Sequence, residues 1–563
     1  MDESGKVLVS GGAAILRSLK SNGVDHLFIN PGSDLAPIIE AYAGSDGSGF
    51  PEFVPATHEN VVVSMAHGYH LATGMLAAAA VHVNVGLANA AMGLLNAHSD
   101  DVPIFMISGR NPLTEGTRLG SRRTPIQYGQ EMFDQTGIVR EAVKWDYELR
   151  YAENAADVVS RGCALAMTEP RGAVYLSLPR EPLCEMTEQP GAVPQVAASF
   201  PYPDPAAVEA AARTLARARN PLIICSRGDA AGAVSRQLKA IARENSIAVS
   251  EVFVTRNILP TGFEYGVGGN IAAHLPSADA VLVVDTPVAW IESKACAAPG
   301  AEIIHMGPDP LFGRMPVRGY KTTQAIQCNT VAGLEALRKA LPGSPDTERT
   351  ASIKSHHAVF RGAIGAKSEV GSQVLANKAW VAQCISDILD DGVIFAERAG
   401  PLSLYTVQGP NQWFGNTQAG GLGWGLPAAL GHQLADRERL TVCVVGDGSY
   451  IFANPIACHQ VAAAQKLPLL TVVLNNGGWD AVRISTLDVY PDGHASRADQ
   501  VPTVPFSPVP EYERIAQAAG CYAETVENAG DLPAALKRAL SVIRQERRQV
   551  LLDVKIGMDD GEK

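Results

Sequence analysis

The sequence predicts an α/β protein built from parallel β-sheets that are covered by helices on both faces. Short runs rich in valine, isoleucine and leucine recur along the 563 residues, and longer alanine-rich amphipathic segments separate them. This alternation is the pattern of βα units. The apolar runs lack strict alternation, as expected of strands that are buried on both sides. The expected strands are residues 79–85, 103–109, 173–179, 221–226, 280–285, 302–307, 392–397, 440–447, 469–476 and 550–556.

Two polar segments that contain proline, residues 185–205 and 342–370, interrupt this series of strands. A chain of this length is too long for one hydrophobic core. We therefore expect three domains, each a doubly wound parallel sheet: residues 1–185, 203–342 and 372–556. The first and third domains could be related α/β units.

Composition narrows the class of protein. The net charge is −12 and no basic run occurs, which argues against a nucleic-acid partner. Nine scattered cysteines without a CxxC pair are typical of reduced thiols in the cytoplasm. The longest stretch of low charge, residues 75–95, contains a histidine and two asparagines, so it predicts a strand and a helix start rather than a membrane span. With no signal-peptide pattern at the N-terminus, we expect a soluble cytoplasmic protein.

Two polar turns follow two neighbouring apolar runs near the C-terminus. Asp447 lies in the turn GDGS, and 26 residues (449–474) separate its GDG from Asn475 and Asn476, which begin the turn NNGG. This places a carboxylate and an amide at the carboxyl ends of two strands. Their oxygens could hold a hard divalent cation, and the glycines would let a diphosphate approach the backbone. Each turn alone could also be only a turn.

Two further segments offer cofactor-binding chemistry. Glu59 follows a strand-like run and opens an amphipathic helix. A carboxyl group there, in apolar surroundings, could exchange a proton with a ring nitrogen of a bound cofactor. Alternatively, it could simply interact with the helix dipole. The glycine-rich residues 419–431 allow close approach of the backbone to a ligand, or form only a tight strand-to-helix turn.

Together these motifs resemble those of the thiamine diphosphate enzyme family that contains acetolactate synthase, benzoylformate decarboxylase and pyruvate oxidase. The matching segments are HLFINPGSD (26–34), THE (57–59), PRGAVYLSLP (170–179), GGLGWGLPAALG (420–431), GDGS and NNGG. The resemblance covers essentially the whole chain. It implies an N-terminal pyrimidine-binding domain, a central domain and a C-terminal diphosphate-binding domain.

The resemblance also implies which residues hold the cofactors. The Mg²⁺ ligands would be Asp447, Asn476 and the carbonyl of Gly478. The residues facing thiamine diphosphate would be Glu59, Gly420, Leu422, Gly446, Gly448 and Ser449. In this arrangement Glu59 exchanges a proton with the aminopyrimidine ring, Gly420 accepts from its amino group, and Leu422 separates the two rings.

Substrate residues follow from the resemblance to benzoylformate decarboxylase. Ser33 stands where that enzyme contacts the substrate carboxylate, and His82 falls on its first active-site histidine. His82 could therefore be a proton donor, although a core histidine would fit the same position. The second active-site histidine is replaced by Glu292, while residues 128–145, which include Gln130, resemble a segment of acetolactate synthase.

We expect a carbon–carbon lyase or carboligase that uses thiamine diphosphate and Mg²⁺, most simply by decarboxylating a 2-oxo acid through an enamine. The main alternative is a lyase that cleaves a 2-hydroxy ketone or 2-hydroxyacyl-CoA without decarboxylation. A flavin-dependent oxidase and a non-catalytic relative are further alternatives. The resemblance implies a homodimer or homotetramer in which Glu59 of one chain serves the cofactor of another. The donor and acceptor substrates are left open.

Overall fold

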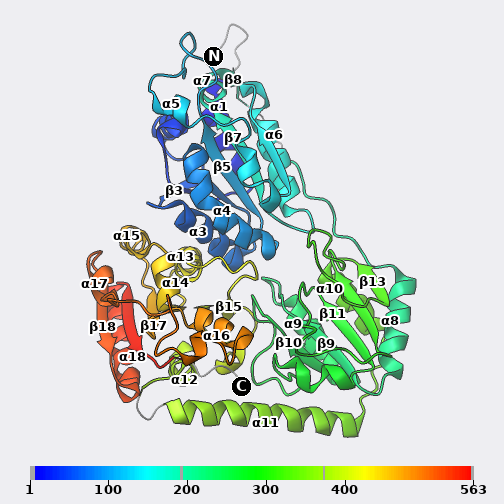
Figure 1. Ribbon diagram of the computed structural model, residues 1–563. Helices are drawn as coiled ribbons and strands as arrows, with labels where there is room; N and C mark the ends of the chain where they lie inside the picture. Colours follow the sequence, from blue (N-terminus) through cyan, green and yellow to red (C-terminus); the bar gives the residue numbers. More distant parts are fainter. Residues whose placement is uncertain (1–6, 190–193, 372–374, 559–563) are drawn as a thin grey trace. The chain divides into compact units, whose positions relative to one another are not determined.

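The computed structural model describes residues 7–189, 194–371 and 375–558. These residues form three parallel sheets of five or six strands, together with helices and one small antiparallel pair, so the predicted α/β class is confirmed (Figure 1). The chain folds into two compact units. One comprises residues 1–199, 417–438 and 449–469, and the other comprises residues 200–416, 439–448 and 470–563.

The first unit contains a six-stranded parallel sheet in the order β3-β2-β4-β5-β7-β6. Its strands are β2 (His26–Ile29), β3 (Glu52–Pro55), β4 (Ala77–Val81), β5 (Ile104–Arg110), β6 (Trp145–Glu148) and β7 (Val174–Pro179). The antiparallel pair is β1 (Leu8–Ser10) and β8 (Met186–Glu188). The helices are α1 (Gly11–Ser21), α2 (Ala36–Ala43), α3 (Glu59–Thr73), α4 (Val83–Ser99), α5 (Ile126–Gly129), α6 (Ala155–Met167), α7 (Arg180–Cys184), α13 (Gly425–Ala435) and α15 (Pro455–Gln465).

The order of this sheet reverses between β2 and β4. The chain passes from β2 to β3 on one side and then returns to β4 on the other side of β2. Ligands of open α/β sheets bind beyond the carboxyl ends of the strands at such a reversal. Residues that follow β2 and β4 are therefore well placed for a site.

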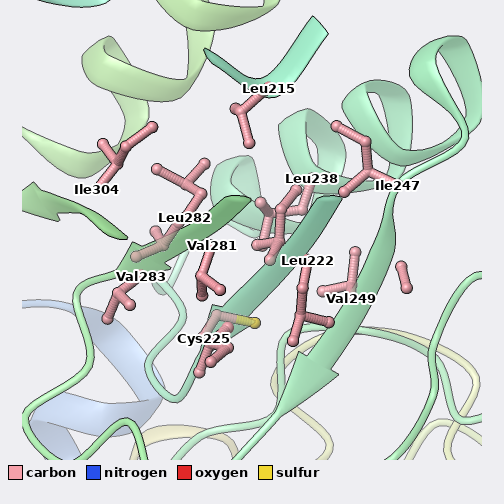
Figure 2. Close-up of a cluster of buried hydrophobic side chains, with 14 of the residues drawn as sticks. Leu215, Leu222, Cys225, Leu238, Ile247, Val249, Val281, Leu282, Val283 and Ile304 are labelled. Carbon is pink, nitrogen blue, oxygen red and sulfur yellow. The ribbon is translucent and has the colours of Figure 1, made fainter. Parts of the chain in front are cut away.

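The central sheet, in the second unit, has the order β10-β9-β11-β12-β13. Its elements are α8 (Pro205–Arg217), β9 (Pro221–Cys225), α9 (Ala233–Asn245), β10 (Ala248–Glu251), β11 (Ala280–Val284), β12 (Glu302–Gly307), β13 (Gln324–Gln327) and α10 (Thr330–Ala340). Leu222 and Val281 on adjacent strands belong to one buried cluster with Leu215 of α8 and Leu238 of α9 (Figure 2). Burial on both faces explains why these strands read as continuous apolar runs.

The C-terminal sheet of the second unit has the order β15-β14-β16-β17-β19-β18. Its elements are α12 (Lys378–Leu389), β14 (Val393–Glu397), β15 (Trp413–Gly415), β16 (Thr441–Gly446), β17 (Leu470–Asn475), α16 (Asp480–Val489), α17 (Tyr512–Gln517), β18 (Tyr522–Val526), α18 (Leu532–Ser541) and β19 (Val550–Lys555). The long helix α11 (Thr347–Gly371) precedes them, and α14 (Asp447–Phe452) straddles the division between the units. The strand order repeats that of the first sheet, which supports the idea that the two are related.

The predicted strands agree with the structure to within one residue at each end, except that the strand expected at residues 79–85 is β4 (Ala77–Val81). That prediction was wrong because β4 ends at Val81 and α4 begins at Val83. The first residues of α4 are as apolar as the strand, and periodicity cannot separate a buried strand from a buried helix start. The three-domain division remains a prediction.

The structure also bears on the expected absence of a membrane span and on the state of the cysteines. Among the described residues, no helix is long and apolar enough to cross a membrane. All nine cysteines lie in the described ranges, and no disulfide bond joins any two of them there.

Helices α3 and α13 of the first unit pack with their backbones in direct contact. A Cβ atom placed on Gly68 would lie 1.8 Å from the carbonyl oxygen of Ala428, and one on Gly431 would lie 2.0 Å from that of Met65. Real Cβ atoms do not approach a backbone oxygen so closely. Both positions therefore require glycine for close approach rather than for a turn.

We expect Gly68→Ala to lower the free energy of opening of α3 by about 1–3 kcal/mol, because the added methyl group overpacks a backbone contact. Native-state hydrogen exchange of the α3 amides measures this change. Gly362→Ala is the matched control, since Gly362 lies in helix α11 and an added Cβ meets nothing within 4 Å. The control should gain stability slightly. Equal protection of α3 in Gly68→Ala and the wild type would contradict the tight contact.

Candidate active site of a cofactor-dependent enzyme

Glu59 is the first residue of α3 and is a buried carboxylate with two amide partners. The side chain of His58 caps the helix by accepting from the backbone N–H of Asn60 at 3.2 Å. Asn30 Nδ2 donates to Glu59 Oε1 at 3.0 Å, and Asn89 Nδ2 donates to Oε2 at 3.0 Å. The expected apolar surroundings are therefore only part of its environment. The two amides fix the direction of the carboxylate.

His82 follows β4 and is the N-cap residue of α4. Its Nδ1 is hydrogen-bonded to Asp34 Oδ1, and its Nε2 lies 3.2 Å from Nε2 of Gln130. The second oxygen of Asp34 accepts from the backbone N–H of Val83 at 3.1 Å. The hydrogen bond to Asp34 raises the pKa of His82 above its usual value, although partial burial acts in the opposite direction. His82 is thus a partly exposed histidine with a carboxylate partner.

Three residues predicted from the sequence, Glu59, His82 and Ser33, lie at this edge of the first sheet. A Cβ atom on Gly86 would lie 3.1 Å from Glu59 Oε1 and 3.3 Å from the Cβ of His82, so the two side chains border the same space. Ser33 is exposed and begins the short 3₁₀ turn Ser33–Leu35 after β2. The site lies where the strand order reverses between β2 and β4.

Sequence reasoning assigned no role to Asp34, Asn30, Asn89 or Gln130. Asp34 and Asn30 flank the PGS turn after β2, and Asn89 lies one and a half turns into α4. For Asn30 and Asp34 the available signal was their polar character just after the apolar run of β2, whereas Asn89 and Gln130 carried no such signal. Only the order of the strands shows which of these polar residues face Glu59 and His82.

Glu292, which stands in place of a second active-site histidine, lies in the second unit. Its carboxylate accepts from Trp290 Nε1 at 2.8 Å and from Cys296 Sγ at 3.0 Å. These local contacts account for both of its oxygens.

The predicted metal ligands lie in the second unit at the carboxyl ends of the adjacent strands β16 and β17. Asp447 is buried, and its oxygens accept from the N–H groups of Gly448 and Gly477, each at 2.8 Å. Burial raises the pKa of Asp447 to about 6, with a further contribution from Asp553. A buried carboxylate of this kind gains from a cation beside it.

The two asparagines of NNGG have different partners. Asn475 is buried and its Nδ2 donates to both oxygens of Asp553, at 3.0 and 3.2 Å. Asn476 is only half-buried, and its Oδ1 accepts weakly from the N–H of Gly478 at 3.3 Å. Asn475 therefore supports the sheet, which leaves the side-chain oxygen of Asn476 available as a ligand.

Two positions in these segments require glycine, one for its backbone conformation and one for space. Gly477 has φ +73°, in the left-handed region, and a Cβ on Gly448 would lie 2.2 Å from the ring of Trp479. Gly446 ends strand β16, and Gly448 and Ser449 follow Asp447 at the start of helix α14, so the GDGS segment is a strand-to-helix junction rather than the expected separate turn. Oxygen ligands from Asp447 and the NNGG turn, with glycine backbone beside them, are the donor set that suits Mg²⁺ and a diphosphate.

The glycine-rich loop that carries Gly420 and Leu422 belongs to the first unit. Gly420 has φ +69°, and Leu422 is half-buried. Asn96 of α4 donates to the carbonyl of Gly421 at 3.0 Å and accepts from its N–H at 3.0 Å. Asn60, next to Glu59, donates to the carbonyl of Gly423 at 3.1 Å. The loop is thus held to the same helices that carry Glu59 and border His82.

Comparison with known proteins places the chain in a family. Residues 9–138 match the N-terminal thiamine pyrophosphate binding domain of thiamine pyrophosphate enzymes, and residues 399–554 match their C-terminal thiamine pyrophosphate binding domain. Benzoylformate decarboxylase of Pseudomonas aeruginosa is 26% identical over 95% of this chain and 97% of its own length. Acetolactate synthase isozyme 3 large subunit of Escherichia coli is 25% identical over 98% and 95%.

A solved structure shows the same fold. Thiamine diphosphate-dependent 4-hydroxybenzoylformate decarboxylase of Rhodococcus jostii aligns with a TM-score of 0.77 at 22% identity, over 98% of this chain and 100% of its own. The chain belongs to the thiamine pyrophosphate enzyme family, and it is an enzyme that uses this cofactor, also called thiamine diphosphate. The buried carboxylates Glu59 and Asp447 lie within the two matched domains.

We expect Asp447→Ala to weaken Mg²⁺-dependent binding of thiamine diphosphate at least tenfold, because the variant loses the anionic oxygen proposed as a metal ligand. Isothermal titration with the cofactor, with and without Mg²⁺, measures this loss. Asp488→Ala, which removes an exposed carboxylate from helix α16, is the control and should bind normally. Unchanged binding by a folded Asp447→Ala protein would refute the metal assignment, and Asn476→Ala provides a second variant.

Proposed function

We propose that this enzyme is a thiamine diphosphate- and Mg²⁺-dependent carbon–carbon lyase or carboligase that most simply decarboxylates a 2-oxo acid. The observation that carries the proposal is the placement of Glu59 and His82 around Gly86, which offers a carboxylate and an imidazole on one sheet edge. Such a pair supplies the proton transfers that this chemistry requires. The similarity to benzoylformate decarboxylase and acetolactate synthase over nearly the whole chain supports it.

The bound cofactor supplies the electron sink for cleavage of the bond beside the substrate carbonyl. Asp447, Asn476 and the carbonyl of Gly478 would hold a Mg²⁺ ion, which would supply positive charge for the cofactor's diphosphate. Glu59 would hold or release a proton at the pyrimidine ring, with its carboxylate kept in place by Asn30 and Asn89.

Further residues would complete the binding of the cofactor. They would be Gly446, Gly448 and Ser449 near the diphosphate, and Gly420 and Leu422 near the rings. The glycines allow the backbone to come close, and the side chain of Leu422 would separate the rings. By family resemblance, we propose a homodimer or homotetramer in which Glu59 of one chain serves the cofactor of another.

Ser33 and His82 would face the substrate. Ser33 is exposed in the turn after β2, and its hydroxyl group can donate a hydrogen bond to a substrate carboxylate. His82 would give a proton to the product-forming carbon or oxygen and recover it from water. Both residues lie beyond the strand ends where the sheet order reverses.

The cleavage of a 2-hydroxyacyl-CoA is less favoured by the contacts. A CoA substrate would need a basic entrance, and residues 118–123 contain three arginines that could form one. Arg118 is paired with Glu185 at 3.1 Å, and Arg122 is paired with Glu131. Two of the three arginines of this segment are therefore neutralised by carboxylates of the same unit.

We expect the reconstituted enzyme to release CO₂ from one or more members of a panel of 2-oxo acids, and Glu59→Gln to lower turnover by about 10²–10⁴-fold while retaining cofactor binding. Coupled CO₂ detection gives the rate, and NMR identifies the products. Glu40→Gln, an exposed carboxylate on helix α2, is the control and should keep normal turnover.

No CO₂ release by a folded, cofactor-loaded enzyme would contradict decarboxylation. Cleavage of a 2-hydroxy ketone by the same preparation would then establish the non-decarboxylating lyase. Near wild-type turnover by Glu59→Gln would remove the proposed role of this carboxylate.

A further inference from the structure

We propose that Asp34 is a positioning residue for His82: by binding Nδ1 it fixes the ring and directs the Nε2 proton at the substrate. The proposal rests on the proposed function, because it specifies how a residue of that site works. Neither the sequence motifs nor the similarity to known enzymes assigned Asp34 a role.

The contacts fix both ends of the Asp34 carboxylate. Oδ1 is hydrogen-bonded to Nδ1 of His82, and Oδ2 accepts from the backbone N–H of Val83 at 3.1 Å. Val83 is the residue after His82, so the carboxylate holds the ring and the backbone that carries it. An ionised carboxylate only accepts, so Nδ1 must be the protonated nitrogen. Nε2 is then the nitrogen that can exchange its proton with a ligand.

Two glycines leave the space that this pair occupies. A Cβ atom on Gly32 would lie 2.0 Å from Nδ1 of His82, and one on Gly109 of β5 would lie 1.6 Å from Oδ2 of Asp34. Gly32 has φ −113°, which any residue can adopt, so its backbone conformation does not require glycine. The need for space between β2, β4 and β5 explains both glycines.

The segment beside Nε2 of the His82 ring is also held in place. The side-chain amide of Gln130 lies beside His82, with the two Nε2 atoms 3.2 Å apart. The amide nitrogen donates to Nε2 of the neutral ring, and the amide oxygen, with the amide turned over, accepts from Nε2–H of the protonated ring. The next residue, Glu131, pairs with Arg110 at 2.9 Å and with Arg122. Arg110 ends β5 and also pairs with Glu148 at 2.8 Å. These ion pairs tether the segment to the sheet, so that Gln130 stays beside Nε2 and can orient the group that bonds there.

Charge favours the protonated ring. Two carboxylates face His82 from other elements, Asp34 from the turn after β2 and Glu59 from α3, and both raise the pKa of His82. A raised pKa keeps the imidazolium at higher pH than a free histidine would. In the transfer, the Nε2–H bond breaks and the proton joins the carbon that has lost CO₂, with the electron pair of the broken carbon–carbon bond forming the new C–H bond. Neutral imidazole remains, with Nδ1–H held by Asp34. Water then returns a proton to Nε2.

The test is the titration of His82 in Asp34→Asn. Asparagine keeps the size and an acceptor oxygen but removes the charge, so we expect the pKa of His82 to fall by about one unit or more. NMR of isotopically labelled histidine in the cofactor-free protein measures this, with His82→Gln assigning the signal. In the loaded enzyme, the alkaline limb of the kcat profile should move to lower pH by the same amount, with cofactor affinity unchanged.

The control is Asp157→Asn, which removes an exposed carboxylate from α6 and should leave both readouts unchanged. Gly32→Ala is a second test, because its added methyl group displaces the ring, and Gly116→Ala, where an added Cβ meets nothing within 4 Å, is its control. An unchanged His82 titration in Asp34→Asn would overturn the proposal. A shifted titration in a protein that releases no CO₂ would instead support the pairing and contradict the proposed decarboxylation.

Discussion

The backbone contact between α3 and α13 is the constraint on which the site in the first unit depends. Glycine at positions 68 and 431 lets the two helices meet without intervening side chains. The contact brings the start of α3 to the glycine-rich loop before α13, where Asn60 bonds to the carbonyl of Gly423. Glu59, one residue earlier, therefore has a fixed position relative to that loop. Rigid helices rather than mobile loops set this geometry.

Three buried carboxylates of the proposed sites are stabilised by different partners. In each case the partner suits the task proposed for the residue. Glu59 receives two amide hydrogens, which orient a carboxylate without adding charge. Asp34 faces a histidine, whose protonation it favours. Asp447 accepts from the backbone N–H groups of Gly448 and Gly477, and burial raises its pKa to about 6. The last of these gains most from an added cation, as expected for a metal ligand.

The sequence predicted the fold class well because buried parallel strands are continuous apolar runs. It missed edge strands such as β6 and β13, whose residues are partly exposed and therefore carry no such run. It also extended β4 into α4, because both are apolar at that point. Among the functional candidates, Glu59 and Asp447 could be named in advance, since each begins a helix directly after a strand-like run.

The sequence by itself determined the α/β class and the two cofactor-binding motifs, because these depend on residues close together in the chain. Only the tertiary structure showed that Asp34 meets His82, 48 residues away, and that Asn89 meets Glu59, 30 residues away. The reason is physical: contacts across a parallel sheet are set by the order of its strands. In this sheet β4 lies beside β2, which brings the residues after both strands to one edge.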